Sequence, residues 1–302
     1  MLASYHDSSR HPLGRTTVSR IGYGAMQLSG DGMFGPPTTD RSESLAVLRA
    51  AVDAGVDHID TAQYYGSGAV NELIRDALYP YPGQLALVSK VAARRDGNGA
   101  LVPYDAPHEL RQGIEDNLNT LGVEQLTAVN LRIINDAPPD GRFIDQLGAM
   151  IQARDDGLIA GIGLSNISLE HLQRALEVTD IVCVQNAFSI ANRTSQRVFD
   201  ECASRGIAFV PFCPLGWPRD QHDAILANPV VTAIARAHTA TPAQVALAWL
   251  LAQSANVLLI AGTTSRRHLL ENLAVGTLSL NSNELAELDA QIDVFEQSES
   301  AR

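Results

Sequence analysis

The chain has 302 residues, a length that suits one α/β barrel of about 250 residues with additions. Hydrophobic residues make up 45% of it and its mean hydropathy is near zero, which is typical of a globular protein and excludes a disordered chain. The formal net charge of −12 disfavours nucleic acid or an anionic membrane as a partner of the whole surface. Any anionic ligand must therefore be bound by a local group of donors.

The remaining composition favours a cytoplasmic protein. Cys183, Cys202 and Cys213 lie far apart and form no CxxC pair, which argues against disulfides and a structural zinc site. The eight histidines form no metal-ligand cluster either, so we expect no metal. The N-terminus lacks an apolar signal core, and the run VALAWLLA is shorter than the roughly 20 residues that span a bilayer. No oligomeric partner is implied.

Helical patterns that end at a glycine and lead into an apolar run recur along the chain. The junctions follow Gly55, Gly122, Gly157 and Gly206. Before Gly122, for example, apolar residues recur every three or four positions on one helix face. The strand-like runs, in order, are 21–26, 57–61, 85–91, 126–132, 159–165, 181–186, 207–212 and 257–262.

Eight strands that alternate with helices, without a Pro/Gly/Ser-rich linker, predict an α/β fold of the (β/α)8 TIM barrel type. We expect one domain over 1–302, and a doubly wound sheet is the alternative. Residues 12–21, PLGRTTVSRI, predict an N-terminal hairpin before the barrel, and 281–295, NSNELAELDAQIDVF, predict an extra C-terminal helix.

Polar residues gather where the predicted strands end. Active sites of such barrels lie at the C-terminal ends of the strands. Each of these side chains alone is more typical of a strand-end cap, but their convergence at consecutive strand ends makes them candidates for a shared site. They are Asp60, Lys90, Arg132, Ser165, Asn166, Gln185 and Asn186.

Lys90 is the single lysine among 22 basic residues, and it follows an apolar run typical of a buried strand. Arginine keeps its proton at ordinary pH, whereas the pKa of a lysine responds to burial and to neighbouring charges. Lys90 is therefore either a chance survivor of a bias toward arginine or a residue whose ammonium group is needed.

The run HIDTAQYYG, residues 58–66, resembles the D-T-A-x-x-Y-G motif of aldo-keto reductases. Further matches are IGYGAMQL, GIGLSN, VQNAFS, VPFCPLG and IAGTTSRRHLLENL, which cover nearly the whole chain. The resemblance implies a barrel enzyme that transfers a hydride between a nicotinamide cofactor and a carbonyl group. It assigns the acid to Tyr65, five residues after Asp60, and leaves Tyr64 as a wall residue.

The implied catalytic group is Asp60, Tyr65, Lys90 and Arg132. Carbonyl reduction needs a proton donor beside the carbonyl oxygen, and Tyr65 supplies it. We expect Lys90 to lower the pKa of Tyr65 and Asp60 to pair with the Lys90 ammonium. Arg132 stands where the family usually has a histidine; it can orient a carbonyl but cannot shuttle a proton. Its alternative role is a salt bridge at the barrel mouth.

The resemblance also implies a cofactor site. Arg266, Arg267 and His268 at a predicted helix start offer donors to a phosphate, so we expect NADP(H) rather than NAD(H). Phe212 replaces the usual stacking tyrosine, and Gly262 replaces a common lysine of the 2′-phosphate site. The implied cofactor-binding residues are Gly24, Met26, Ser165, Asn166, Gln185, Phe212, Pro214, Leu215, Gly216, Gly262, Thr263, Thr264, Ser265, Arg267, His268, Glu271 and Asn272.

Within the family, GYGAMQL, FGPP, ALYPY, VNLR and GLSN look most like bacterial pyridoxal reductases, which implies reduction of pyridoxal to pyridoxine. Arg132 would suit the phenolic oxygen beside the aldehyde, with Phe34, Tyr64 and Trp217 as ring walls. The alternatives are reduction of another aldehyde or ketone, a Schiff-base aldolase that uses Lys90, and a cofactor-bound sensor with slow turnover.

Overall fold

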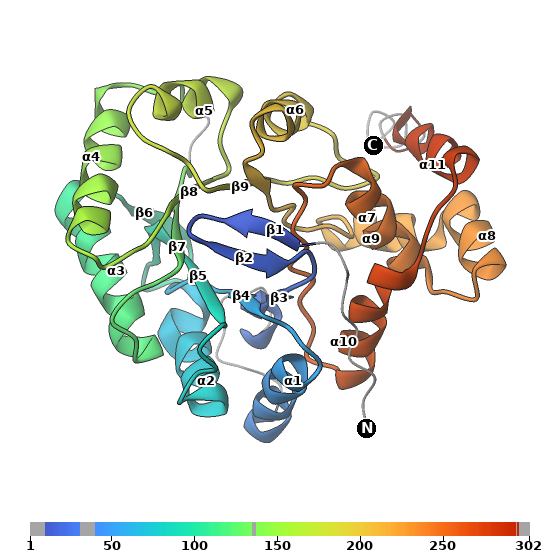
Figure 1. The fold of residues 1–302 in the computed structure, drawn as a ribbon, viewed down its shortest axis with the longest axis horizontal. Coiled ribbons are helices and arrows are strands. Elements are labelled where there is room, and N and C mark those ends of the chain that lie inside the picture. Colours follow the sequence, from blue (N-terminus) through green and yellow to red (C-terminus); the bar gives the residue numbers. More distant parts are fainter. Residues whose placement is uncertain (1–9, 31–39, 135–136, 294, 296–302) are drawn as a thin grey trace.

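The computed structural model describes residues 10–30, 40–134, 137–293 and 295. Parallel strands form a curled inner sheet, and helices surround it as in a TIM barrel (Figure 1). Neighbouring strands pair in the order β10-β9-β8-β7-β5-β4-β3. Their bounds are β3 Tyr23–Gly24, β4 His58–Asp60, β5 Ala86–Arg95, β7 Ala128–Arg132, β8 Ile162–Ser165, β9 Cys183–Gln185 and β10 Ala208–Phe209.

The last predicted strand completes the ring through isolated bridges. Val257 bridges Phe209 at the end of β10, and Leu259 bridges Ile21 before β3, both in parallel. The amide of Gly22 donates to the carbonyl of Leu259 at 2.8 Å. Residues 257–259 thus join the two outermost strands of the sheet, which a doubly wound sheet does not do. The barrel prediction is confirmed, although this segment pairs less continuously than predicted.

The predicted N-terminal hairpin is present and covers the N-terminal end of the barrel. Strand β1, Arg10–Leu13, pairs antiparallel with β2, Thr16–Ser19, and the pair lies across the centre of the ring in Figure 1. Leu13 and Val18 are buried against residues from inside the barrel. Asp57, just before β4, accepts a hydrogen bond from the Ser19 amide at 3.0 Å. The hairpin therefore plugs one end of the barrel.

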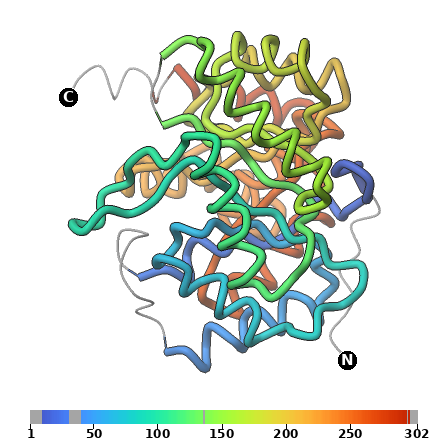
Figure 2. The backbone as a smooth tube through the Cα atoms, turned by 90° about the vertical axis from the view of Figure 1, so that its left-hand side faces the viewer, coloured from blue at the N-terminus to red at the C-terminus, as the bar shows by residue number. Residues whose placement is uncertain are grey.

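The structure contains a second hairpin that the sequence did not predict. β5 runs five residues past Lys90 and pairs antiparallel with β6, Leu101–Tyr104. The β5–β6 hairpin projects from the barrel in Figure 2 (teal, left). Its signal was the turn-forming run DGNG, residues 96–99, between two apolar stretches. Lys90 consequently lies inside a strand rather than at its end.

Four helices end at the glycines that the sequence marked as helix ends. Gly55, Gly122, Gly157 and Gly206 all have positive φ, a conformation that glycine adopts without steric cost. The extra C-terminal helix is present as α11. The helices are α1 Arg41–Asp53, α2 Ala69–Leu78, α3 Pro107–Leu121, α4 Gly141–Asp155, α5 Leu169–Leu176, α6 Gln196–Arg205, α7 Arg219–Ala227, α8 Pro229–Ala237, α9 Pro242–Gln253, α10 Arg266–Leu273 and α11 Ser282–Asp289, with 3-10 turns η1 Ala25–Leu28, η3 Tyr65–Gly68 and η4 Ala274–Thr277.

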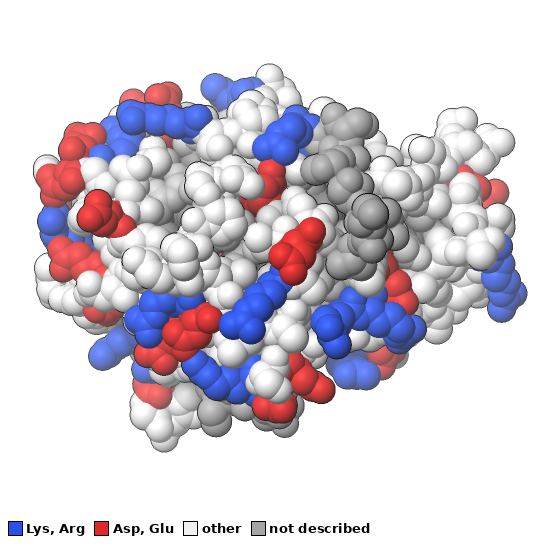
Figure 3. Space-filling view, turned by 60° about the horizontal axis from the view of Figure 1, so that its bottom comes forward, with Lys and Arg blue, Asp and Glu red and all other residues white. Residues whose placement is uncertain are grey.

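The surface and the helices carry few other signs of a binding site in the described ranges. On the face shown in Figure 3, acidic and basic side chains are intermingled rather than gathered by sign. Along the described part of the chain, none of the helices combines the length and apolar character that a bilayer crossing requires. The same residues contain no group of three or more His, Cys, Asp or Glu side chains placed to hold a metal ion.

Candidate active site

A tight turn after β4 presents Tyr65 to the barrel mouth. The Tyr65 amide donates to the carbonyl of Ala62 at 3.0 Å. The next three residues, 66–68, all have positive φ, and two of them are glycines, which adopt this conformation readily. The turn reverses the chain before α2 begins at Ala69, so its short sequence Y-G-S-G sets the position of the phenol.

Lys90 is buried, and its ammonium group interacts with two acceptors. Its side chain is 3% exposed, and its ammonium forms an ion pair with Asp60 and donates to the carbonyl of Thr61 at 2.9 Å. The Nζ atom lies 5.1 Å from the centre of the Tyr65 ring. The structure thus brings Asp60, Tyr65 and Lys90 together. An aldolase lysine must present a free amine to a carbonyl, and this ammonium is instead committed to two acceptors.

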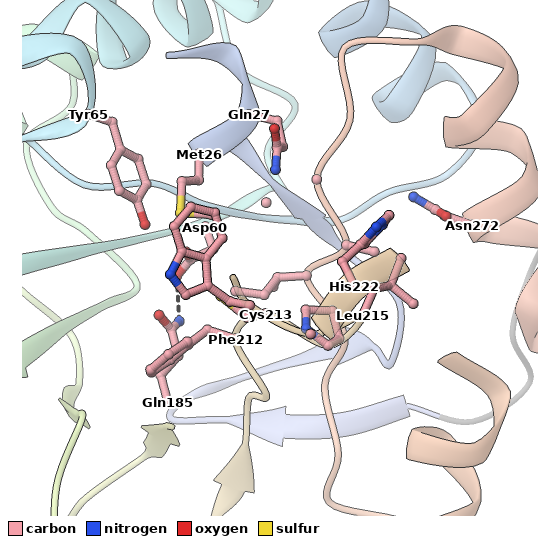
Figure 4. A pocket seen from close by; sticks show the side chains of 17 residues that line it. Met26, Gln27, Asp60, Tyr65, Gln185, Phe212, Cys213, Leu215, His222 and Asn272 are labelled. Atoms are coloured by element: carbon pink, nitrogen blue, oxygen red, sulfur yellow. Dashed lines mark hydrogen bonds between the residues drawn. The ribbon is translucent and has the colours of Figure 1, made fainter. Parts of the chain in front are cut away.

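Two cavities meet at the barrel mouth and share one wall. The first, here called the cofactor arm, extends from Tyr65 past Phe212 and Leu215 to Asn272; Figure 4 shows Tyr65 and Asn272 on opposite sides of it. The second, here called the substrate arm, continues from Tyr65 toward Arg95 and Arg132. The shared wall consists of Met26, Tyr65, Gln185, Phe212, Cys213 and Trp217.

Gln185 offers an acceptor with no partner on this shared wall. Its Nε2 atom donates to Asp60 Oδ2 at 2.8 Å, the dashed line in Figure 4. Its Oε1 atom is buried and has no hydrogen-bond partner, which costs free energy unless a ligand donates to it. The carboxamide of a nicotinamide carries such an N–H donor, and Phe212 supplies a ring for stacking nearby. These residues therefore fit a nicotinamide in the cofactor arm.

Two glycines allow the backbone to close beneath the cofactor arm. A Cβ atom at Gly262 would lie 2.4 Å from the carbonyl oxygen of Gly24, and one at Gly24 would lie 2.2 Å from that of Ile260. Both obstacles are backbone atoms, which cannot move aside as a side chain can. This explains why position 262 is glycine here: a lysine would force apart the segments before η1 and before α10.

Arg132 lies at the end of β7 and lines the substrate arm. Its Nη1 atom donates to Ser165 Oγ at 3.2 Å, and its guanidinium carbon lies 5.5 Å from the centre of the Phe212 ring. No described carboxylate forms an ion pair with it. The alternative reading of Arg132 as a salt bridge at the barrel mouth therefore finds no partner in the described ranges.

The net pKa of Tyr65 moves opposite to our expectation. Burial raises the pKa of Tyr65 above its ordinary value, the Asp60 carboxylate raises it further, and Arg132 and Arg95 lower it only in part. The prediction that Lys90 would bring this pKa below its ordinary value is wrong, because the Lys90 charge is paired with Asp60 and desolvation dominates. Tyr65 stays a protonated phenol at neutral pH, as a proton donor must.

The expected 2′-phosphate donors lie at the start of α10, outside both arms. Ser265 caps this helix by accepting from the His268 amide, and Thr263 accepts from the Ser265 amide. The Arg267 side chain is 75% exposed and pairs with Glu271 at 3.2 Å. Thr264 also lies outside the arms, while Asn272 lines the cofactor arm. The helix start keeps its basic side chains at the surface, within reach of a phosphate in solution.

The other predicted residues divide between the arms and their supports. Gly24, Met26, Pro214, Leu215, Gly216 and Gly262 line the cofactor arm, and Tyr64 and Trp217 line the substrate arm. Ser165 is buried behind Arg132, and Asn166 donates to the carbonyl of Ile133 at 2.8 Å, so neither lines an arm. Phe34 lies outside the described residues. The lining residues that sequence reasoning missed are Gln27, Arg95, Leu101, Cys213, His222, Ile260 and Ala261.

The family model described as "Aldo/keto reductase family" matches residues 20–293. The chain belongs to the aldo/keto reductase family. It is therefore an oxidoreductase of the carbonyl and alcohol pair, and the resemblance inferred from its motifs is confirmed.

Relatives and solved structures agree with this assignment. The chain is 43% identical to pyridoxine 4-dehydrogenase of Escherichia coli (strain K12), over 93% of this chain and 98% of that protein. It is 33% identical to an uncharacterized oxidoreductase of Schizosaccharomyces pombe, over 92% and 88%. An aldo/keto reductase from Klebsiella pneumoniae, solved in complex with NADP and acetate, superposes with a TM-score of 0.78 at 26% identity over 94% and 95%.

Proposed function

We propose that this protein reduces an aldehyde to an alcohol with NADPH, and that pyridoxal is its substrate. The observation that carries the proposal is the meeting of the two arms at Tyr65, Gln185 and Phe212. One arm suits a nicotinamide and the other suits a small ring. The 43% identity to a pyridoxine 4-dehydrogenase supports pyridoxal as the carbonyl partner.

Tyr65 is the proton donor in this proposal. Its phenol lines both arms, so a carbonyl oxygen at their junction would accept a hydrogen bond from it. The Lys90 ammonium, which is paired with Asp60, lies 5.1 Å from the centre of the Tyr65 ring and so places a buried cation beside the phenol. As the carbonyl oxygen gains negative charge, the buried cation stabilises it and the phenol releases its proton.

The chain's own residues would hold the cofactor along the cofactor arm. Gln185 Oε1 would accept from the carboxamide, the Phe212 ring would stack on the nicotinamide, and residues 214–216 would lie against the pyrophosphate. Arg267 and His268 would pair with the 2′-phosphate at the start of α10, which supports NADPH over NADH. The bound cofactor supplies the hydride that the carbonyl carbon receives.

An aldehyde panel with NADPH and NADH tests this proposal. The purified protein is assayed by loss of absorbance of the reduced cofactor with pyridoxal, benzaldehyde, butanal and glyceraldehyde. We expect pyridoxal with NADPH to give the highest kcat/KM. If pyridoxal is inert while another aldehyde is reduced well, the substrate is wrong and the reductase assignment stands. Tight NADPH binding without turnover of any aldehyde would favour a cofactor-bound sensor.

A further inference from the structure

The substrate arm contains a second arginine that no motif singled out. Arg95 is the last residue of β5 and enters the arm from the β5–β6 hairpin. Arg132 enters the same arm from β7. Both line it together with Tyr64 and Leu101. The arm therefore receives two guanidinium groups from two different segments of the chain.

Arg132 is an incompletely satisfied cation. Its hydrogen bond goes to the neutral hydroxyl of Ser165, and its Nε atom is buried without a hydrogen-bond partner. Among the described side chains, no carboxylate lies within ion-pair distance of it. A desolvated guanidinium with an unmet N–H is costly until an acceptor arrives. An anionic oxygen in the substrate arm would supply both the missing negative charge and a hydrogen-bond acceptor for the guanidinium.

Arg95 adds a second positive charge to the arm, and it interacts electrostatically with Arg132. Its Nη1 atom donates to the carbonyl of Gly99 at 3.0 Å, which ties the guanidinium to the turn of the hairpin. Burial lowers the pKa of Arg95, Tyr64 and Tyr65 raise it, the positive charge of Arg132 lowers it, and the neighbouring Asp96 carboxylate raises it. The two cations are thus close enough to repel, and a shared anion would relieve the repulsion.

No carboxylate among the described residues lines the substrate arm. Asp60, which lines the cofactor arm, is bound to Lys90 and Gln185. The other walls are aromatic or apolar, including Tyr64, Leu101 and Phe212. Such a pocket suits a flat ring that bears an anionic oxygen, since paired arginines bind such oxygens through two or more N–H groups.

We infer that Arg95 and Arg132 together bind an anionic oxygen of the substrate, so that the aldehydes reduced best are aromatic ones that carry a carboxylate or a phenolate. This inference rests on the proposed reductase function and adds the substrate class. Arg95 becomes a residue that determines specificity, and the β5–β6 hairpin becomes the element that supplies it.

The test compares matched aldehydes with the intact protein and NADPH. Benzaldehyde is the neutral reference, the 2-, 3- and 4-carboxybenzaldehydes test carboxylates, and pyridoxal against pyridine-4-carbaldehyde tests a phenolate. We expect at least one anionic aldehyde to exceed its neutral partner in kcat/KM by about tenfold or more. The two pairs show which anion is preferred. A neutral aldehyde that matches or exceeds every anionic one would overturn the inference.

Arg95→Gln and Arg94→Gln form a matched pair of variants. Arg94 is the exposed neighbour of Arg95 on the same strand, and its guanidinium carbon lies 5.2 Å from the centre of the Tyr104 ring instead. We expect Arg95→Gln to lower the ratio of anionic to neutral kcat/KM by about tenfold, with benzaldehyde little changed, and Arg94→Gln to preserve the ratio. Equal ratios in both variants contradict the inference. Loss of all aldehyde turnover in the unmodified protein would instead refute the proposed function.

Discussion

The Lys90 ammonium lies between the Asp60 carboxylate and the Tyr65 ring. It donates to Asp60 and to the carbonyl of Thr61, and the side chain is 3% exposed. A guanidinium is planar and wider than an ammonium, so it cannot take the same place without moving its neighbours. This difference in shape is a physical reason for lysine rather than arginine at position 90.

We expect Lys90→Met to lower kcat for aldehyde reduction about 100-fold or more, because the carbonyl oxygen that gains charge loses the buried cation beside Tyr65. NADPH binding, followed by quenching of its fluorescence, should change little, since Lys90 does not line the cofactor arm. Lys90→Arg should also be severely impaired. An arginine variant that folds normally and keeps wild-type activity would show that the identity of Lys90 is not mechanistic.

Arg132 gives a prediction about pH. Arg132 lowers the pKa of Tyr65 against the larger effect of burial, so Arg132→Leu should raise this pKa further. Alcohol oxidation needs Tyr65 as a base, and its activity therefore rises as the phenol loses its proton. We expect the ascending limb of the kcat/KM profile for alcohol oxidation to move to higher pH in Arg132→Leu. An unmoved profile would mean that the two side chains do not interact electrostatically.

At the scale of elements, the sequence predicted the strand–helix unit that recurs around the barrel, but it did not predict the β5–β6 hairpin, which occurs once. Alternating apolar runs and glycine-terminated helices indicated the barrel, because each glycine takes a backbone conformation that ends a helix. The β5–β6 hairpin interrupts the alternation of strand and helix, so the predicted third strand stops near Lys90 although β5 continues to Arg95. Arg95 and Leu101 were therefore not among the predicted site residues.

For the candidate site, the sequence predicted the residues but not their electrostatics. Asp60, Tyr65, Lys90 and Arg132 were found from one motif and from strand ends, and the structure places all four around the junction of the arms. The direction of the Tyr65 pKa was not found, because desolvation depends on how many distant segments cover a side chain. The spacing of residues in the sequence does not show how many distant segments will cover a side chain in the fold.

The contact between the segments at Gly24 and Gly262 can be tested by adding one methyl group. Gly262→Ala should lower the free energy of unfolding by about 1 to 3 kcal/mol and weaken NADPH binding, because the new Cβ meets the Gly24 carbonyl oxygen. Gly148→Ala in α4 is the control, since nothing lies within 4 Å of a Cβ there. Thermal unfolding and NADPH titration of both variants would check this. A Gly262→Ala protein indistinguishable from wild type would show that the backbone yields easily.

At the scale of the whole molecule, the plug of the barrel depends on one buried carboxylate. Burial alone would raise the pKa of Asp57, but the His58 ring nitrogen 3.6 Å away, the hydrogen bond from the Ser19 amide and the ion pair with Arg10 outweigh it and lower this pKa. Ionised Asp57 therefore stabilises the fold above its ordinary pKa of about 4. That contribution is lost as the pH falls through the lower pKa of the folded state.

Asp57→Asn should accordingly cost about 1 to 3 kcal/mol of unfolding free energy at pH 7, and its difference from wild type should shrink below about pH 4. Urea unfolding between neutral and acidic pH measures both effects. Asp53→Asn is the control, because Asp53 is exposed at the end of α1 and should show neither. A difference for Asp57→Asn that is constant with pH would contradict the assignment.

The β1–β2 hairpin covers the N-terminal end of the barrel, and the two arms lie at the opposite end, where they share the wall formed by Gln185 and Phe212. A cofactor bound along the cofactor arm would cover this wall and would then form one side of the space for the aldehyde. We therefore expect the cofactor to bind first and leave last. In steady-state kinetics the oxidised cofactor should compete against the reduced cofactor, and the alcohol product should not. Competition by the alcohol against the reduced cofactor would contradict this order.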